Sequence, residues 1–100
     1  MIRVLHKMPG EDARMVEIEN TLEAFQRAVD GYIEGVRIAT DCAVVCNEEG
    51  RLLGMDYNCR ICGVDFVGPV VIAGVKRDEF TDVPVGVTDF EEWMLDDDGI

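Results

Sequence analysis

Four cysteines carry the most recognisable ligand spacing in the chain, Cys42-x3-Cys46-x12-Cys59-x2-Cys62. Thiolates at such intervals are the ligands of tetrahedral zinc sites. However, residues 43–47 form an apolar run that predicts a buried strand, in which Cys42 and Cys46 lie about 13 Å apart at ~3.3 Å per residue. Because zinc binds each sulfur at ~2.3 Å, one ion cannot reach both. A zinc-binding or thiol protein using the four cysteines is therefore an alternative that requires the strand prediction to be wrong.

The second half of this motif, Cys59 and Cys62, also has the C-x2-C spacing of a redox pair. Redox chemistry favours the first cysteine at a helix N-terminus, where the thiolate is stabilised. Here a predicted loop leads into a valine-rich strand instead. The sequence thus favours small buried side chains for Cys42 and Cys46 and loop thiols for the other two.

The remaining chemistry-bearing residues form no catalytic constellation. His6 is the only histidine, and its place on a predicted strand indicates a strand-face residue, although a pairing with a cysteine stays open. Gly68 and Gly74 are scattered along an apolar run rather than gathered in a phosphate-binding loop. Glu48 and Glu49 fall in a predicted turn, where carboxylates are solvated. The sequence predicts a non-enzymatic protein with no catalytic, metal or cofactor-binding residues.

Negative charge is concentrated at the end of the chain. The net charge is −12, and residues 78–100 hold nine acidic residues and no lysine or arginine. Such a surface repels phosphate backbones and anionic lipids, but it attracts a basic protein surface. A simpler interpretation, a charged segment that only keeps the protein soluble, stays open. The predicted partner-binding residues are Asp89, Glu91, Glu92, Asp96, Asp97 and Asp98.

A helix predicted over about residues 20–30 organises the rest of the chain. Asn20 offers an N-cap, and Glu23 offers the reciprocal half of a capping box. Gly31 can take the left-handed conformation that ends a helix. Apolar side chains recur along one face at helical spacing: Leu22, Phe25 and Val29.

The flanking segments predict strands, separated by turns at residues 8–11 and 47–51 and by loops at 56–63 and 77–86. A second capping box, Thr88 with Glu91, opens a short C-terminal helix at about residues 89–95. The fold class that follows is α+β: a mostly antiparallel sheet of five to six strands, one main packed helix and the short C-terminal helix. Alternating or continuous apolar residues mark the strands at 2–7, 14–19, 32–38, 43–47, 52–55 and 66–75.

Length and composition fit one packed domain over residues 1–100. The chain has 100 residues, of which 48% are hydrophobic, enough for a core without disulfides or metals. No stretch approaches 18 apolar residues, and the N-terminus lacks the long apolar region of a secretory signal. A cytoplasmic location is therefore expected.

A set of residues spread over residues 2–75 matches a known pattern. They are Val16, Ile18, Asn20-Thr21-Leu22, Phe25-Gln26, Val29, Gly31, Ile33, the run from Cys46 to Leu52, Asn58, Gly68, Val70-Val71-Ile72 and Gly74. In them the chain resembles the DUF3846 family, small acidic proteins of bacteria, phages and other mobile elements. The resemblance implies a compact α+β domain in a mobile-element setting and brings no catalytic residues. Three of the cysteines and the acidic end lie outside it.

The leading functional hypothesis is a small acidic binding protein of phage or mobile-element type. It would inhibit a host nucleic-acid-binding or defence protein by presenting an acidic surface, as a DNA mimic does. No direct binding of nucleic acid or membrane is expected, and the oligomeric state is not predicted. A small-ligand protein that binds or sequesters a nucleotide between sheet and helix is the second hypothesis, and the cysteine-based zinc or thiol protein is the third.

Overall fold

The computed structural model describes residues 1–84, in which one helix and eight strands form an α+β fold. The predicted fold class is thus confirmed for this part of the chain, and the helix predicted at about residues 89–95 lies outside the described residues. In chain order the elements are β1 (Ile2–Lys7), β2 (Arg14–Ile18), α1 (Leu22–Val29), β3 (Ile33–Ala39), β4 (Cys42–Asn47), β5 (Tyr57–Ile61), β6 (Val64–Val67), β7 (Val70–Lys76) and β8 (Glu79–Thr81).

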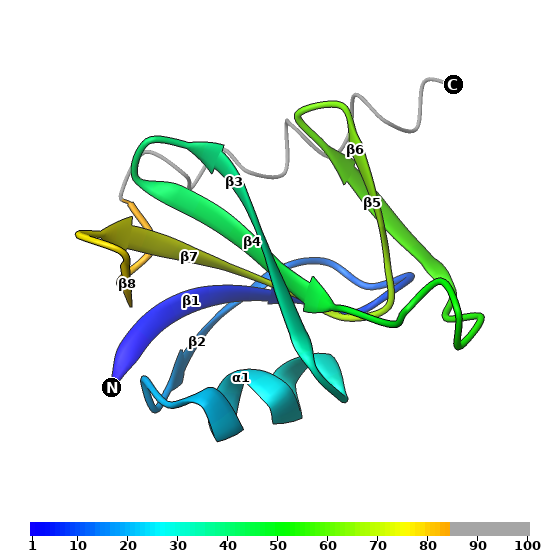
Figure 1. Ribbon diagram of the computed structural model, residues 1–100, viewed down its shortest axis with the longest axis horizontal. Coiled ribbons are helices and arrows are strands. Elements are labelled where there is room, and N and C mark those ends of the chain that lie inside the picture. The colour runs from blue at the N-terminus through cyan, green and yellow to red at the C-terminus, as the bar shows by residue number, and fades with distance from the viewer. Residues whose placement is uncertain (85–100) are drawn as a thin grey trace.

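Six strands form one antiparallel sheet in the order β2-β1-β7-β4-β3, with β8 paired to β7, and β5 and β6 form a separate hairpin. Helix α1 and the β5–β6 hairpin lie on opposite sides of the larger sheet (Figure 1). We call these two sides the helix face and the hairpin face.

Strand β4 shows why both faces are apolar. All six of its residues are buried, and because side chains alternate along a strand, they point to both faces of the sheet. Cys42, Val44 and Cys46 join the cluster on the hairpin face, whereas Val45 joins the one beneath α1. A central strand covered on both faces needs a continuous apolar run, as the sequence predicted for residues 43–47.

The first hairpin forms as expected from its turn residues. Pro9 and Gly10 occupy the two central positions, Gly10 has φ +78°, and the Glu11 amide donates to the Met8 carbonyl at 3.1 Å. This geometry requires a residue that tolerates positive φ at the second central position, which glycine does. The predicted strands at 2–7 and 14–19 pair antiparallel through this turn.

The helix caps differ from the prediction by one residue at each end. Thr21, not Asn20, is the N-cap: its hydroxyl accepts from the Ala24 amide at 3.2 Å. The predicted capping box with Glu23 is therefore wrong, because the third helical residue is Ala24. At the other end the left-handed residue is Asp30, with φ 62°, rather than Gly31.

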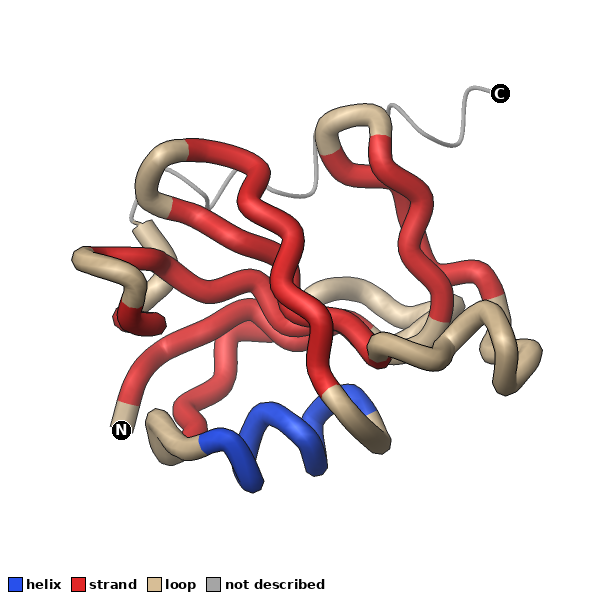
Figure 2. Tube along the Cα trace, viewed as in Figure 1, coloured by secondary structure: helices blue, strands red, loops and turns tan. Residues whose placement is uncertain are grey.

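The segment between β4 and the hairpin was predicted wrongly. Residues 52–55 do not return as a strand; they continue a coiled turn in which the Leu53 amide donates to Glu49 and the Met55 amide to Gly50. Figure 2 shows this segment as the loop that leads from β4 to the hairpin. Residues 56–63, predicted as a loop, contain strand β5. Short local hydrogen bonds thus replace the expected hairpin.

Two further boundaries follow from residues with positive φ. The predicted strand at 66–75 is divided at Gly68, with φ +73°, so that β6 belongs to the hairpin and β7 to the large sheet. The predicted loop at 77–86 begins with a turn at Arg77 and Asp78, both at positive φ, after which β8 pairs with β7. No helix in the described part of the chain is long and apolar enough to cross a membrane.

Candidate functional site

A groove of about 230 Å³ lies between the large sheet and the β5–β6 hairpin. One side comes from the β3–β4 pair and the turn that directly follows β4, and the other side comes from strand β6, farther along the chain. We call it the hairpin groove. The lining side chains used below are Glu34, Val36, Glu48, Arg51, Leu52 and Val64, and Cys46 also lines it.

Two carboxylates lie on the same face of the sheet at this groove. Glu34 of β3 pairs with Cys46 of β4, and the Glu48 amide continues the ladder by donating to the Tyr32 carbonyl at 2.8 Å. Glu34 and Glu48 are therefore diagonal neighbours, a relation in which residues are about 7–8 Å apart. Both are exposed, and neither carboxylate forms a hydrogen bond or ion pair with another of residues 1–84.

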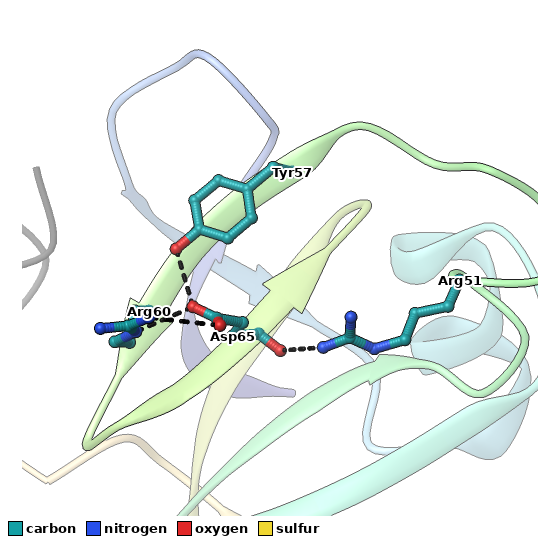
Figure 3. Close-up of polar contacts among 4 residues, drawn as sticks. All are labelled: Arg51, Tyr57, Arg60 and Asp65. Carbon is teal, nitrogen blue, oxygen red and sulfur yellow. Dashed lines mark hydrogen bonds and ion pairs between the residues drawn. The ribbon is translucent and has the colours of Figure 1, made fainter. Parts of the chain in front are cut away.

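The other wall is tied together by Asp65 of β6 (Figure 3). Arg60 donates to its carboxylate at 2.9 Å and the Tyr57 hydroxyl at 3.0 Å, while Arg51 donates to its backbone carbonyl at 3.1 Å. The hydrogen bonds from Arg60 and then Tyr57 lower the pKa of Asp65 below its usual range. Arg51 thus links the turn after β4 to the hairpin and closes one side of the groove.

Strand β4 contributes one thiol to the groove, that of Cys46, and burial and the neighbouring charges change its pKa. Cys46 is buried, and its thiol lies 3.6 Å from the Glu34 carbonyl. Burial raises the pKa of Cys46 to about 11; the negative charge of Glu34 raises it further, and Arg51 lowers it by less. The Cys46 thiol at the base of the groove is therefore neutral at physiological pH.

A buried polar pair fastens the hairpin to the large sheet. Lys7, at the end of β1, donates to the side-chain oxygen of Asn58 at 2.8 Å, and the Asn58 amide donates to the carbonyls of Lys7 and Gly68 at 2.9 and 2.7 Å. Both side chains are 9% exposed. Because a buried ammonium or amide without a partner is costly, this arrangement specifies where the hairpin sits.

A second buried amide, that of Asn47, fixes the turn at the base of the groove. It donates to the Val29 and Asp30 carbonyls at 3.1 and 3.0 Å and accepts from the Glu49 amide at 2.8 Å. It therefore satisfies carbonyls at the C-terminus of α1 and at the same time bends the chain after β4. A Cβ at Gly31 would lie only 2.6 Å from its nitrogen, so the close approach requires glycine there.

The cysteines do not assemble into a ligand set. Cys42, Cys46 and Cys59 are buried and Cys62 is exposed, all as free thiols. Cys42 and Cys46 lie on one strand, as predicted, and among residues 1–84 no three His, Cys, Asp or Glu side chains gather closely enough to hold a metal ion. Burial, the charge of Asp41 and that of Cys62 raise the pKa of Cys42 to about 11.

His6 lies on the helix face, where its Nε2 is 2.9 Å from the Ala28 carbonyl. Since a carbonyl only accepts, Nε2 must carry the proton. A shallow pocket of about 460 Å³ adjoins it between α1 and the β1–β2 hairpin, and Arg27 lines the same pocket. This is the region between sheet and helix in which the sequence placed a small-ligand alternative.

The six predicted partner-binding acids, Asp89, Glu91, Glu92, Asp96, Asp97 and Asp98, lie outside the described residues. The hairpin groove was not predicted. Glu48 was expected to be solvated in a turn, and nothing in the local sequence places Glu34 beside it, because their proximity arises from the pairing of β3 with β4. The sequence could have revealed this proximity only if the strands predicted at 32–38 and 43–47 had been paired through the turn between them.

The fold and the groove define a small α+β domain in which one antiparallel sheet supports a helix on one face and a hairpin on the other. The chain belongs to the DUF3846 family, whose model, described as a domain of unknown function, matches residues 2–94. Comparisons with curated proteins and with solved structures give no match.

Several residues that carried the family resemblance hold the fold together. Asn47 and Asn58 make the buried amide contacts described above, and Gly31 makes room for Asn47. Gly68 turns the chain from the hairpin into β7, and a side chain at Gly74 would collide with the Asp82 carbonyl. The fold therefore explains why each of these positions of the family pattern carries an asparagine or a glycine.

Proposed function

We propose that this protein is a small acidic binding protein that acts by occupying a basic surface of a partner protein, without catalysing a reaction. The observation that carries the proposal is the charge distribution. Six acidic residues and no lysine or arginine fall within residues 85–100, and the whole chain carries −12. A concentrated negative field accelerates and selects encounters with a positively charged surface.

The rest of the chain adds to the same field. Of the 21 acidic residues, six lie in 85–100, which leaves fifteen against nine basic residues in 1–84. Two of those nine, Arg37 and Arg60, are already paired with Asp78 and Asp65. The excess of carboxylates therefore extends onto residues 1–84, so a partner would also meet acidic groups carried by the sheet and the helix.

The mobile-element setting of the family suggests the kind of partner. A phage or mobile element gains from blocking a host defence or nucleic-acid-binding protein, and such proteins carry basic surfaces for phosphates. A dense array of carboxylates would act there as a mimic of the nucleic-acid backbone. Inhibition by occupancy is the mechanism we propose.

The test is an affinity capture from host lysate with the full chain as bait, compared with a variant in which the six acids at 89, 91, 92, 96, 97 and 98 become Asn or Gln. We expect the wild-type bait to retain a basic nucleic-acid-binding protein that elutes as salt rises, and the variant to lose it while keeping its circular dichroism spectrum. Equal capture by both baits would refute the role of these residues.

A second candidate function is supported by the pocket between α1 and the β1–β2 hairpin. Its volume of about 460 Å³ falls within the usual range of small-molecule sites, and Arg27 offers a charge for an anion such as a nucleotide phosphate. A bound nucleotide would raise the melting temperature in proportion to the logarithm of its concentration. A nucleotide panel in thermal-shift assays, with Arg27→Gln as the control variant, decides this alternative.

A further inference from the structure

We propose that the hairpin groove is the subsite that receives a single arginine or lysine side chain of the basic partner, with its aliphatic stem against the apolar wall and its cation between Glu34 and Glu48. This inference rests on the proposed function, because it assumes a basic partner. It adds a defined anchor point on the described domain.

The shape of the groove suits one side chain rather than a small molecule. Its volume of about 230 Å³ is below the roughly 300–1,000 Å³ of small-molecule pockets. Val36, Leu52 and Val64 supply apolar contact along it, and Leu52 and Val64 are 86% and 38% exposed. Long cationic side chains bury an apolar stem while keeping the charged end near water.

The charges in the groove are placed for a cation. Glu34 and Glu48 occupy diagonal positions, a relation in which residues lie about 7–8 Å apart, and both line the groove, so a cation in the groove can approach both carboxylates. Neither has a partner within residues 1–84. Arg51 also lines the groove, but its hydrogen bond goes to the Asp65 carbonyl and not to either glutamate.

The backbone that carries the two carboxylates is held in place before any partner arrives. Glu34 belongs to a paired strand, and Glu48 is anchored through its amide to Tyr32. The turn behind it is held by the Asn47 side chain. Preorganisation of this kind lowers the entropic cost of binding, which favours an anchor here over one on an unconstrained carboxylate.

The experiment is a two-dimensional amide NMR titration of the full chain with acetyl-Gly-Arg-Gly-amide. The matched probe is the same peptide with citrulline, which keeps the shape and removes the charge. We expect saturable shifts at Glu34, Val36, Glu48 and Leu52, with a weak dissociation constant of order tens of millimolar, because each exposed ion pair contributes little binding free energy. The citrulline peptide should not saturate them.

Variants distinguish binding in the groove from nonspecific attraction to the net negative charge of the protein. Glu34→Gln with Glu48→Gln should weaken binding about three- to tenfold, whereas Glu17→Gln with Glu79→Gln removes the same charge elsewhere and should change it less than twofold. Leu52→Ser should weaken binding about two- to threefold without any change in charge. Amide dispersion checks that each variant is folded.

Three outcomes would overturn the subsite: uniform shifts, equal losses in both double variants, or saturable shifts confined to residues 85–100. The last would leave the proposed function intact, because the acidic end alone would then bind the cation. Failure of the lysate capture with intact groove binding would overturn the proposed function and leave a groove that binds a cationic side chain without the proposed partner. The two claims are therefore separable.

Discussion

Asn47 offers the sharpest test of how the groove is built. Its side-chain amide makes three hydrogen bonds, at 2.8, 3.0 and 3.1 Å, and is 5% exposed. Asn47→Ala removes all three and leaves the Val29 and Asp30 carbonyls without this donor. At about 0.5–1.5 kcal/mol for each bond, the free energy of unfolding should fall by about 2–4 kcal/mol.

The loss should be visible in both chemical and thermal unfolding. For a domain of this size about 4–8 °C of melting temperature corresponds to each kcal/mol, so we expect a decrease of about 10–30 °C. Asn20→Ala is the matched control, because it removes one exposed hydrogen bond, from Asn20 to the Phe80 carbonyl at 2.9 Å. That control should cost no more than about 1 kcal/mol.

A charged variant tests the direction of the hydrogen bonds. Asn47→Asp keeps the acceptor for the Glu49 amide but points a carboxylate at two carbonyls and at the negative end of the helix dipole. Its pKa should rise in the folded state, so its destabilisation should be complete at neutral pH and should decrease as the pH falls and the carboxyl becomes a donor. If Asn47→Ala unfolds within 1 kcal/mol of wild type, or Asn47→Asp is indifferent to pH, the account of this turn is wrong.

Two further predictions address the helix cap and the thiols. Thr21→Ala should lower the free energy of unfolding by about 1 kcal/mol in urea titration, because it removes the Oγ1 atom that caps the helix. If Asn20→Ala has the larger effect, then Asn20 and not Thr21 is the N-cap. In thiol labelling of the native protein at pH 8, exposed Cys62 should react first, while Cys42 and Cys46, with pKa values near 11, should stay protonated and react only as the pH approaches 11 or the protein unfolds. Rapid labelling of more than one thiol at pH 8 would contradict the burial described here.

Local signals predicted the elements that depend on local chemistry. The turn at Pro9-Gly10 and the buried strand over 43–47 could be read from residue type alone, because glycine geometry and a continuous apolar run have few alternatives. The helix was predicted with its caps displaced by one residue. Asn20 and Thr21 both favour N-caps, and only the contact of Asn20 with Phe80, sixty residues away, decides between them.

Elements stabilised by distant contacts were missed. The sequence of strand β5 shows no clear alternation of apolar and polar residues, because one of its buried residues is the polar Asn58. Hydrogen bonds to Lys7 and Gly68 satisfy this side chain in the interior. Residues 52–55 carry two leucines that suggest a strand, yet Leu52 and Leu53 are 86% and 62% exposed in a turn. The groove shares this origin, since its walls meet only when β3, β4 and β6 are assembled.

The position of β7 has a consequence for how the chain reaches its native state. The β1–β2 and β3–β4 hairpins each close locally, but they meet only through β7, which pairs with both. The contact between Leu5 and Ile72 spans 67 residues, so much of the chain must be available before the sheet can form. During synthesis, the inner edges of β1 and β4 stay open until residues 70–76 leave the ribosome. Assembly is therefore expected to be late and slow for a chain of this length, with two open strand edges at risk of pairing with other chains in the interval.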